Sequence, residues 1–238
     1  MTKSIYLSPS TQENNIGVGS YGTEEQRMNI LADVTQKVLE GHGVNVYRNK
    51  PEWSLSQVVA DSNLKKPDIH FAVHSNAGNG KTRGCEVYCH RFGGNGEKLA
   101  KAVYEELSPL TPTGDRGIKE GYSFYGPGKH MYELAYTNAP AALAETAFHD
   151  NPDDAQWLMS NVDLIGTALA KGVLKYFNIP FKWGSPNLDS ELNVLQEFGI
   201  IQSPDYWRRN AVKGKNISGE YAAILIKRVA ALLTKGVN

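Results

Sequence analysis

The chain has 238 residues, of which 41% are hydrophobic and 21% charged, as in an ordinary globular protein with one sizeable core and room for a small second module. Its 25 basic residues balance its 25 acidic residues, so the formal net charge is zero. This balance gives no electrostatic reason to expect nucleic acid or an anionic membrane as a partner. No stretch approaches the roughly 20 apolar residues of a membrane span, so membrane insertion is not expected.

The N-terminal segment, residues 1–9, has an apolar run that is too short for a signal peptide. We therefore expect synthesis in the cytoplasm, with any action outside the cell following release by lysis or another exit route. Cys85 and Cys89 would lie roughly 13 Å apart along one strand. A disulfide needs α-carbons closer than about 7 Å, so we expect two buried thiols.

Strand and helix patterns alternate along the first three quarters of the chain. Short apolar runs bounded by glycine or proline predict strands at residues 4–8, 44–47, 69–74, 84–90 and 139–145. Helical periodicity predicts helices at residues 23–41, 55–63, 97–107 and 153–177. This alternation predicts an α/β fold, a parallel-rich twisted sheet flanked by helices. Ligands of such sheets bind at the carboxyl ends of the strands.

The start of the first helix carries a capping pattern. Thr23 can accept a hydrogen bond from the first turn while Gln26 reaches back to the cap. Glu24 and Glu25 fall at the positive end of the helix dipole, which is the common reason for acids at this position.

The pattern changes after Phe177. Residues 179–186 resemble a linker, and two helical segments follow, at residues 188–198 and 219–233. We therefore predict two domains, residues 1–179 and a small helical C-terminal module of residues 180–238. Between its helices the module joins aromatic and cationic side chains in the segment 203–209, as a glycan-binding surface does, although Tyr206 and Trp207 suit a small core equally well.

Three polar residues stand where chemistry is expected. His74 and Glu145 close two predicted strands, and Glu24 opens the first helix. Taken singly, Glu24 is explained by the helix dipole and His74 by a hydrogen bond in the core. Glu145 is harder to explain in this way, because a carboxylate after an apolar strand costs several kcal/mol to bury unless it is paired or near a metal.

Five motifs occur together and in order over residues 3–177. They are Ser8-Pro9-Ser10, Glu24 with Ala32 eight residues later, His74-Ser75-Asn76-Ala77, Arg116-Gly117-Ile118-Lys119, and Pro140-Ala141-Ala142-Leu143-Ala144-Glu145-Thr146-Ala147-Phe148. This set resembles the catalytic domain of the zinc-dependent N-acetylmuramoyl-L-alanine amidases, the family of bacterial autolysins and phage endolysins. The resemblance implies a cell-wall hydrolase whose substrate is bacterial peptidoglycan.

The resemblance implies that Glu24 and His74 are zinc ligands and that Glu145 is the catalytic base. The spacing to Ala32 favours Glu24 over Glu25. The family's first zinc histidine should fall near Thr11, but the chain has no histidine there, and neither threonine nor glutamine is a usual zinc ligand. We expect the third ligand to be His149, on the loop beyond Glu145, with the amide oxygen of Gln12 as the alternative.

The implied mechanism is attack of a zinc-activated water on the lactyl amide carbonyl, with Glu145 moving the proton to the leaving L-alanine amine. Asn76 and Arg116 are expected to orient the substrate or the groups that surround the metal. His70 lies four residues before His74 on the same strand, roughly 13 Å away, and is expected to be structural.

Two rival functions remain at this level. One is a zinc peptidase or deacylase that cuts another amide. The other is a non-catalytic wall-binding protein that keeps the amidase fold, against which Glu145 argues, because a binding module does not need a buried carboxylate. The C-terminal module is expected either to bind the wall or to form a homo-oligomer.

Overall fold

The protein is described here by a computed structural model that places residues 2–113, 116–182, 188–211 and 214–235. The chain divides into two compact units, Met1–Pro180 and Phe181–Asn238. None of the helices within these described ranges is both long and apolar enough to cross a membrane.

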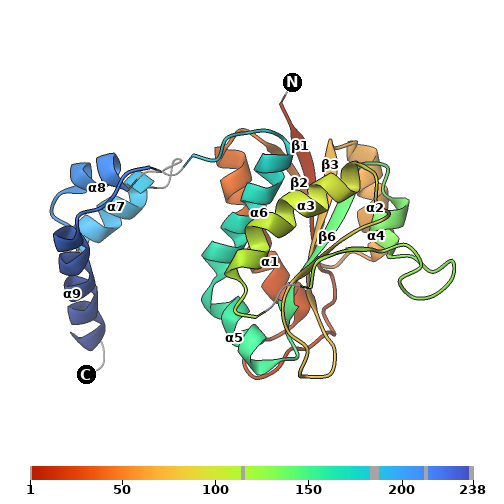
Figure 1. Cartoon of the computed structure of the whole chain (residues 1–238), viewed down its shortest axis with the longest axis horizontal. Helices are drawn as coiled ribbons and strands as arrows, with labels where there is room; N and C mark the ends of the chain where they lie inside the picture. Colours follow the sequence, from red (N-terminus) through yellow and green to blue (C-terminus); the bar gives the residue numbers. More distant parts are fainter. Residues whose placement is uncertain (1, 114–115, 183–187, 212–213, 236–238) are drawn as a thin grey trace. The chain divides into compact units, whose positions relative to one another are not determined.

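The first unit is built on one mixed sheet (Figure 1). The described strands are β1 (Ser4–Pro9), β2 (Asn45–Arg48), β3 (Ile69–Asn76), β4 (Glu86–Cys89), β5 (Ile118–Glu120) and β6 (Ala141–Phe148), in the order β2-β1-β3-β6-β4-β5. All neighbouring pairs are parallel except β4 and β6, which are antiparallel. The prediction of a parallel-rich α/β sheet is therefore confirmed.

Helices cover both faces of this sheet (Figure 1). Those of the first unit are α1 (Glu24–Gly41), α2 (Leu55–Lys65), α3 (Asn95–Leu107), α4 (Tyr132–Tyr136), α5 (Pro152–Ser160) and α6 (Val162–Tyr176), with a 3-10 turn at Ser108–Leu110. On one face, α6 packs between α1 and α3; on the other, α2 contacts α4. Residues 70, 72 and 74 of β3 face α2 and α4, because successive strand side chains alternate between faces.

The start of α1 has the predicted capping box. The Thr23 hydroxyl accepts a hydrogen bond from the Gln26 amide, and the Gln26 side chain accepts one from the Thr23 amide. Met28, Leu31 and Ala32 are buried on one side of the helix, as the periodicity predicts. The cap therefore places Glu24 at the first helical position, beside the end of β3.

Several elements differ from the prediction. The helix predicted for residues 153–177 is two helices, because Asn161 leaves the helical conformation (φ −128°, ψ 29°) and starts α6. The short elements β5, α4 and α8 (Pro204–Asn210) were not predicted, since three to seven residues are too few for periodicity to show. Cys85 and Cys89, both placed by the structure, are buried and not joined in a disulfide, as expected.

The second unit consists, in its described part, of α7 (Leu188–Glu197), α8 and α9 (Gly219–Lys235). Leu192, Ile201 and Trp207 form its small core. Tyr206 stacks on Tyr221 with ring centroids 3.8 Å apart. Trp207 is only 8% exposed, so this aromatic ring serves the core of the unit rather than a surface for glycan.

The crossing of α3 and α6 predicts a sensitive position. A Cβ atom at Gly172 would lie 2.4 Å from the Val103 Cα, and backbone cannot move aside cheaply. We expect Gly172→Ala to lower the free energy of unfolding of the first unit by about 1–3 kcal/mol, measured by denaturant titration. Gly219→Ala, where nothing lies within 4 Å, is the matched control. Equal stability of the two variants would contradict the close crossing.

Candidate active site

Three polar residues lie side by side at one edge of the sheet. In the strand register, His74 of β3 pairs with Glu145 of β6, and Glu145 pairs with Glu86 of β4. Because β4 runs antiparallel to β6, its first residue lies on the side of the sheet toward which β3 and β6 run. The register shifts just beyond His74, an irregularity of the kind that re-aims side chains beside active sites.

Glu24 reaches this edge from the first turn of α1. It is 1% exposed, and its Oε1 lies 2.8 Å from His74 Nδ1. Its other oxygen accepts a hydrogen bond of 2.6 Å from the Asn15 side-chain amide. Burial alone would raise the pKa of Glu24, but the hydrogen bond and charge of His74 hold it below its usual value. The structure thus brings two of the predicted metal ligands into direct contact.

Glu145 presents a reactive carboxyl group next to this pair. Its Oε2 is buried and has no hydrogen-bond partner among the described residues. Burial raises its pKa to about 8; the charge of His74 opposes this rise, and those of Glu24 and Glu86 add to it. A carboxyl group that titrates near neutral pH can both accept and deliver a proton, which general acid–base catalysis requires.

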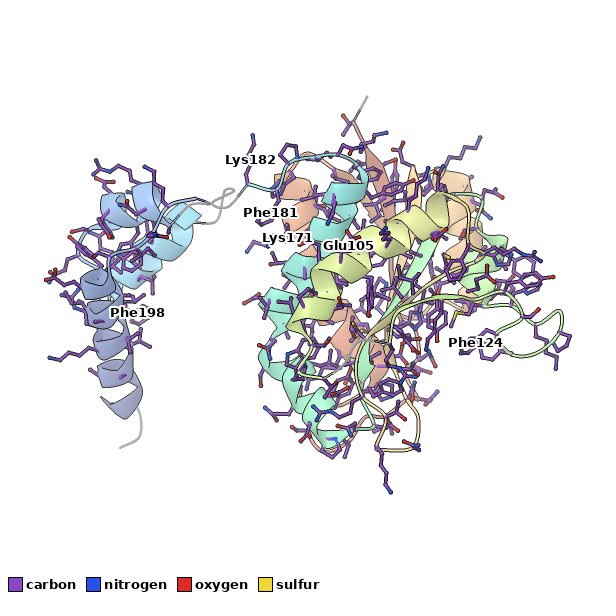
Figure 2. All side chains as sticks on the ribbon, in the orientation of Figure 1. Glu105, Phe124, Lys171, Phe181, Lys182 and Phe198 are labelled. Atoms are coloured by element: carbon purple, nitrogen blue, oxygen red, sulfur yellow. The ribbon has the colours of Figure 1, made fainter. Side chains whose placement is uncertain are left out.

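A cavity of about 290 Å³ opens over these groups. Its polar wall includes Gln12, His74 and Glu145, and its apolar wall includes Leu143 and Tyr125. Figure 2 shows Phe124, the neighbour of Tyr125, on the loop between β5 and α4, which extends from the body of the unit. The cavity therefore joins the Glu145 carboxyl group to an apolar surface that can hold an organic substrate.

The two residues predicted as alternative third ligands lie in different places. The side-chain nitrogen of Gln12 is 3.5 Å from His74 Nδ1, in the wall of the cavity. His149 is fully buried and stacks on Tyr21. Its Nδ1 is 2.9 Å from the Ser75 hydroxyl and its Nε2 is 3.1 Å from the Asn15 side-chain oxygen, so both ring nitrogens have protein partners. His149 is linked to Glu24 indirectly, through Asn15 and Ser75.

Asn76 and Arg116 meet at Glu86. The Asn76 side-chain amide donates to Glu86 Oε1 at 2.8 Å, and Arg116 Nε donates to Oε2 at 2.8 Å. Lys119 also pairs with Oε2, and the Tyr88 hydroxyl donates to Oε1. Burial would raise the pKa of Glu86, but hydrogen bonds from Lys119, Tyr88 and Arg116 hold it below its usual value, and Lys119 has the largest effect of the three. The two predicted residues therefore surround the neighbour of Glu145.

Sequence reasoning missed Glu133, which contacts His74 from the other side. Glu133 Oε2 lies 3.5 Å from His74 Nε2, and Oε1 lies 3.1 Å from His70 Nε2. His70 is fully buried, in keeping with its predicted structural role. The only signal for Glu133 was a carboxylate in an otherwise aromatic and apolar segment, and nothing local tied it to His74.

Comparison with known proteins identifies the family and the fold of the first unit. The family model described as N-acetylmuramoyl-L-alanine amidase matches residues 5–175. The chain belongs to this family. The match contains Glu24, His74 and Glu145 and ends before the second unit.

Similar proteins are also cell-wall amidases by name. The chain is 26% identical over 186 residues to the N-acetylmuramoyl-L-alanine amidase LytC of Bacillus subtilis, an alignment that covers 74% of the chain and 36% of LytC. It is 26% identical over 187 residues to the amidase CwlM of Bacillus licheniformis, covering 74% of the chain and 69% of CwlM. The catalytic domain of CwlV from Bacillus (Paenibacillus) polymyxa has the same fold, with a TM-score of 0.67 at 18% identity, over 75% of the chain and 100% of that domain.

The side chains present can be tested against a zinc ion. Among the described residues, no three His, Cys, Asp or Glu side chains converge on one point. Atoms that share a tetrahedral zinc lie roughly 3.3 Å apart, given bonds of about 2.0–2.2 Å. Glu24 Oε1 and the Gln12 amide lie 2.8 Å and 3.5 Å from His74 Nδ1. Rotating the Gln12 amide by half a turn exchanges its nitrogen and oxygen, so that the oxygen faces His74 Nδ1. Glu24 and Gln12 therefore lie close enough to His74 Nδ1 for each to share a zinc ion with it, which would make two usual ligands and one unusual ligand.

The Glu86 cluster predicts a pH-dependent contribution to stability. Because its pKa is lowered in the folded state, ionised Glu86 stabilises the fold above the unfolded pKa of about 4.3, and this contribution is lost as the pH falls through the lower folded value. We expect Glu86→Gln to cost about 1–3 kcal/mol near pH 7, toward the lower end because Lys119 is 37% exposed. The difference from wild type should shrink below about pH 4.

Denaturant titration at a series of pH values measures this difference. Glu52→Gln, at an exposed position, is the control. A cost that does not change between pH 7 and pH 3 would show that the charge of Glu86 is not what stabilises the cluster.

Proposed function

We propose that the chain is a zinc-dependent peptidoglycan hydrolase that cleaves the amide bond between N-acetylmuramic acid and the L-alanine of the stem peptide. The observation that carries this proposal is the unpartnered Oε2 of Glu145, which shares a cavity with His74 beside the Glu24–His74 pair. Membership in the amidase family supports the substrate and the bond that is cut.

Glu24, His74 and Gln12 would hold the metal. A carboxylate and an imidazole are ordinary zinc ligands, and the Gln12 amide oxygen takes the place of the family's missing histidine. When bound, zinc supplies a Lewis acid that polarises a carbonyl group and acidifies a water molecule. This assignment reverses the order expected from sequence, in which His149 preceded Gln12, because Gln12 lines the cavity and the nitrogens of His149 have other partners.

The chain's own residues move the proton. Glu145 Oε2 faces no competing donor, so it accepts a proton from the attacking water and returns it to the amine of the departing L-alanine. Its raised pKa matches this double role near neutral pH. Asn76 and Arg116 fix the Glu86 carboxylate beside Glu145, and we assign them to positioning rather than to direct contact with substrate.

We also propose that the second unit either binds the cell wall or forms a homo-oligomer. Wall binding or homo-oligomerisation would each increase the time that the enzyme spends at its polymer. Since the Trp207 ring is buried in the core of this unit, a wall-binding surface would have to be built from other side chains. Action on the wall after release of the enzyme from the cytoplasm stays a prediction.

Turnover should depend on the Glu145 carboxylate. Glu145→Gln keeps the size of the side chain but removes the proton acceptor, so release of free amines from purified peptidoglycan should fall by at least 100-fold. Folding and zinc content should stay at wild-type levels. Turnover at the wild-type rate would rule out the proposed base.

Substrate controls separate the rival functions. A zinc peptidase would also release amines from stem peptides that lack muramic acid. A non-catalytic wall binder would sediment with cell walls and release no amines.

Zinc affinity should depend on Gln12, the proposed third zinc ligand. Gln12→Ala removes a group 3.5 Å from His74 Nδ1 and should weaken zinc binding by 10-fold or more, measured by competition with a chelator. His149→Ala is the matched comparison, and it should lower stability with a smaller effect on zinc affinity, since His149 contacts Ser75 and Asn15. Loss of zinc from His149→Ala alone would restore His149 as the ligand.

A further inference from the structure

Glu133 is a buried carboxylate with three polar partners. It is 4% exposed and lies in α4, at the wall of the cavity that holds Glu145. The Ser8 hydroxyl donates to its Oε1 at 2.5 Å, and His70 Nε2 lies 3.1 Å from the same oxygen. Its Oε2 is left for His74, whose Nε2 is 3.5 Å away. A carboxylate in such a place is costly unless it is paired and hydrogen-bonded.

The two ring nitrogens of His74 face different carboxylates. Nδ1 lies 2.8 Å from Glu24 Oε1, with Gln12 nearby, whereas Nε2 has no hydrogen bond among the described residues and has Glu133 Oε2 as its charged neighbour at 3.5 Å. A neutral imidazole has one N–H and one lone pair, and the group that accepts from the N–H decides which nitrogen keeps the lone pair. Glu133 Oε1 accepts from the Ser8 hydroxyl and lies 3.1 Å from His70 Nε2, so Oε2 is the oxygen that can accept the proton of His74.

We propose that Glu133 is a positioning residue, which holds the proton of His74 on Nε2 and so directs the lone pair of Nδ1 toward the metal. This inference rests on the proposed zinc site. Residues that bind the second nitrogen of a ligand histidine in this way commonly change metal affinity by 10-fold to 100-fold. Glu133 would therefore act on zinc through His74 without touching the substrate.

His70 holds Glu133 in place, and Ser62 in turn holds His70. His70 Nδ1 is 3.0 Å from the Ser62 hydroxyl, and its Nε2 contacts Glu133, so the hydroxyl can donate to Nδ1 while Nε2–H donates to the carboxylate. The His70 ring also stacks on Tyr6 at 5.4 Å with an interplanar angle of 9°. These contacts fix the carboxylate on the side of His74 that is opposite Glu24.

A purely structural role for Glu133 makes a different prediction. If Glu133 only satisfied the buried His70, its loss would lower stability and leave zinc binding unchanged. Ser62→Ala gives the matched comparison, because it removes the other hydrogen bond of His70 and leaves His74 untouched.

The test is zinc affinity of the full chain, measured by chelator competition, for wild type, Glu133→Gln and Ser62→Ala. We expect Glu133→Gln to weaken zinc binding by 10-fold to 100-fold and Ser62→Ala to change it by less than 2-fold. Nitrogen NMR of the zinc-loaded wild type should show His74 metal-bound at Nδ1 and protonated at Nε2. Circular dichroism of each metal-free variant checks that it is folded. If Glu133→Gln does not fold, the NMR assignment of the wild type decides.

Three results would overturn the proposal in distinguishable ways. Affinity of folded Glu133→Gln within 2-fold of wild type would reduce Glu133 to a structural partner of His70. Metal bound at Nε2 of His74 would reverse the geometry. No zinc binding by the wild type would remove the proposed zinc function itself, and the positioning role with it.

Discussion

The arrangement of the site depends on the contact between His74 and Glu24 at the carboxyl end of β3. Two buried carboxylates, Glu24 and Glu133, face the two nitrogens of one imidazole. Burial disfavours the charged form of each of these groups, and their pairing with one another outweighs it. Desolvation alone would lower the pKa of His74, but its contacts with Glu133 and Glu24 raise that pKa well above its usual value. Glu145 Oε2 has no hydrogen-bond partner among the described residues, which leaves it available for proton transfer.

The sheet order makes this concentration of charge possible. Placing β6 between β3 and β4 puts Glu145 between His74 and Glu86, with Glu86 neutralised from the outer side by Arg116 and Lys119. The antiparallel direction of β4 is necessary, because it brings the first residue of that strand to the active edge. The helix start at Glu24 completes the set from the opposite face, and its cap fixes where that helix begins. The catalytic groups are thus held by regular elements, which limits their freedom to move.

Much of the fold could be predicted from sequence because its signals are local. Five of the strands lie where short apolar runs stand between glycines and prolines, and the Thr23 cap identified the start of α1. The break at Asn161 was missed because both flanking segments have helical periodicity and one polar residue does not interrupt it.

Within the site, Glu24, His74 and Glu145 were recognisable by type and spacing. Gln12 and His149 could not be ranked, since loop conformation decides which of them lines the cavity. Glu133 could not be predicted, because it meets His74 through tertiary packing of α4 against the sheet and lies 59 positions from it in sequence.

The chain thus contains an amidase-family domain, which lacks the histidine expected near Thr11, and a second helical unit. A carboxylate and an amide still lie within 3.5 Å of His74 Nδ1, and His74 shares a cavity with Glu145. The point to test is therefore which bond the protein cuts, and the proposed bond is the amide between muramic acid and L-alanine.

The most direct test is mass spectrometry of the products that the zinc-loaded protein releases from purified peptidoglycan. The account predicts intact stem peptides with a free L-alanine amine, together with glycan whose muramic acid has lost its peptide. Peptides cut at an internal bond, or peptides that still carry muramic acid, would contradict it, and so would the absence of any released product.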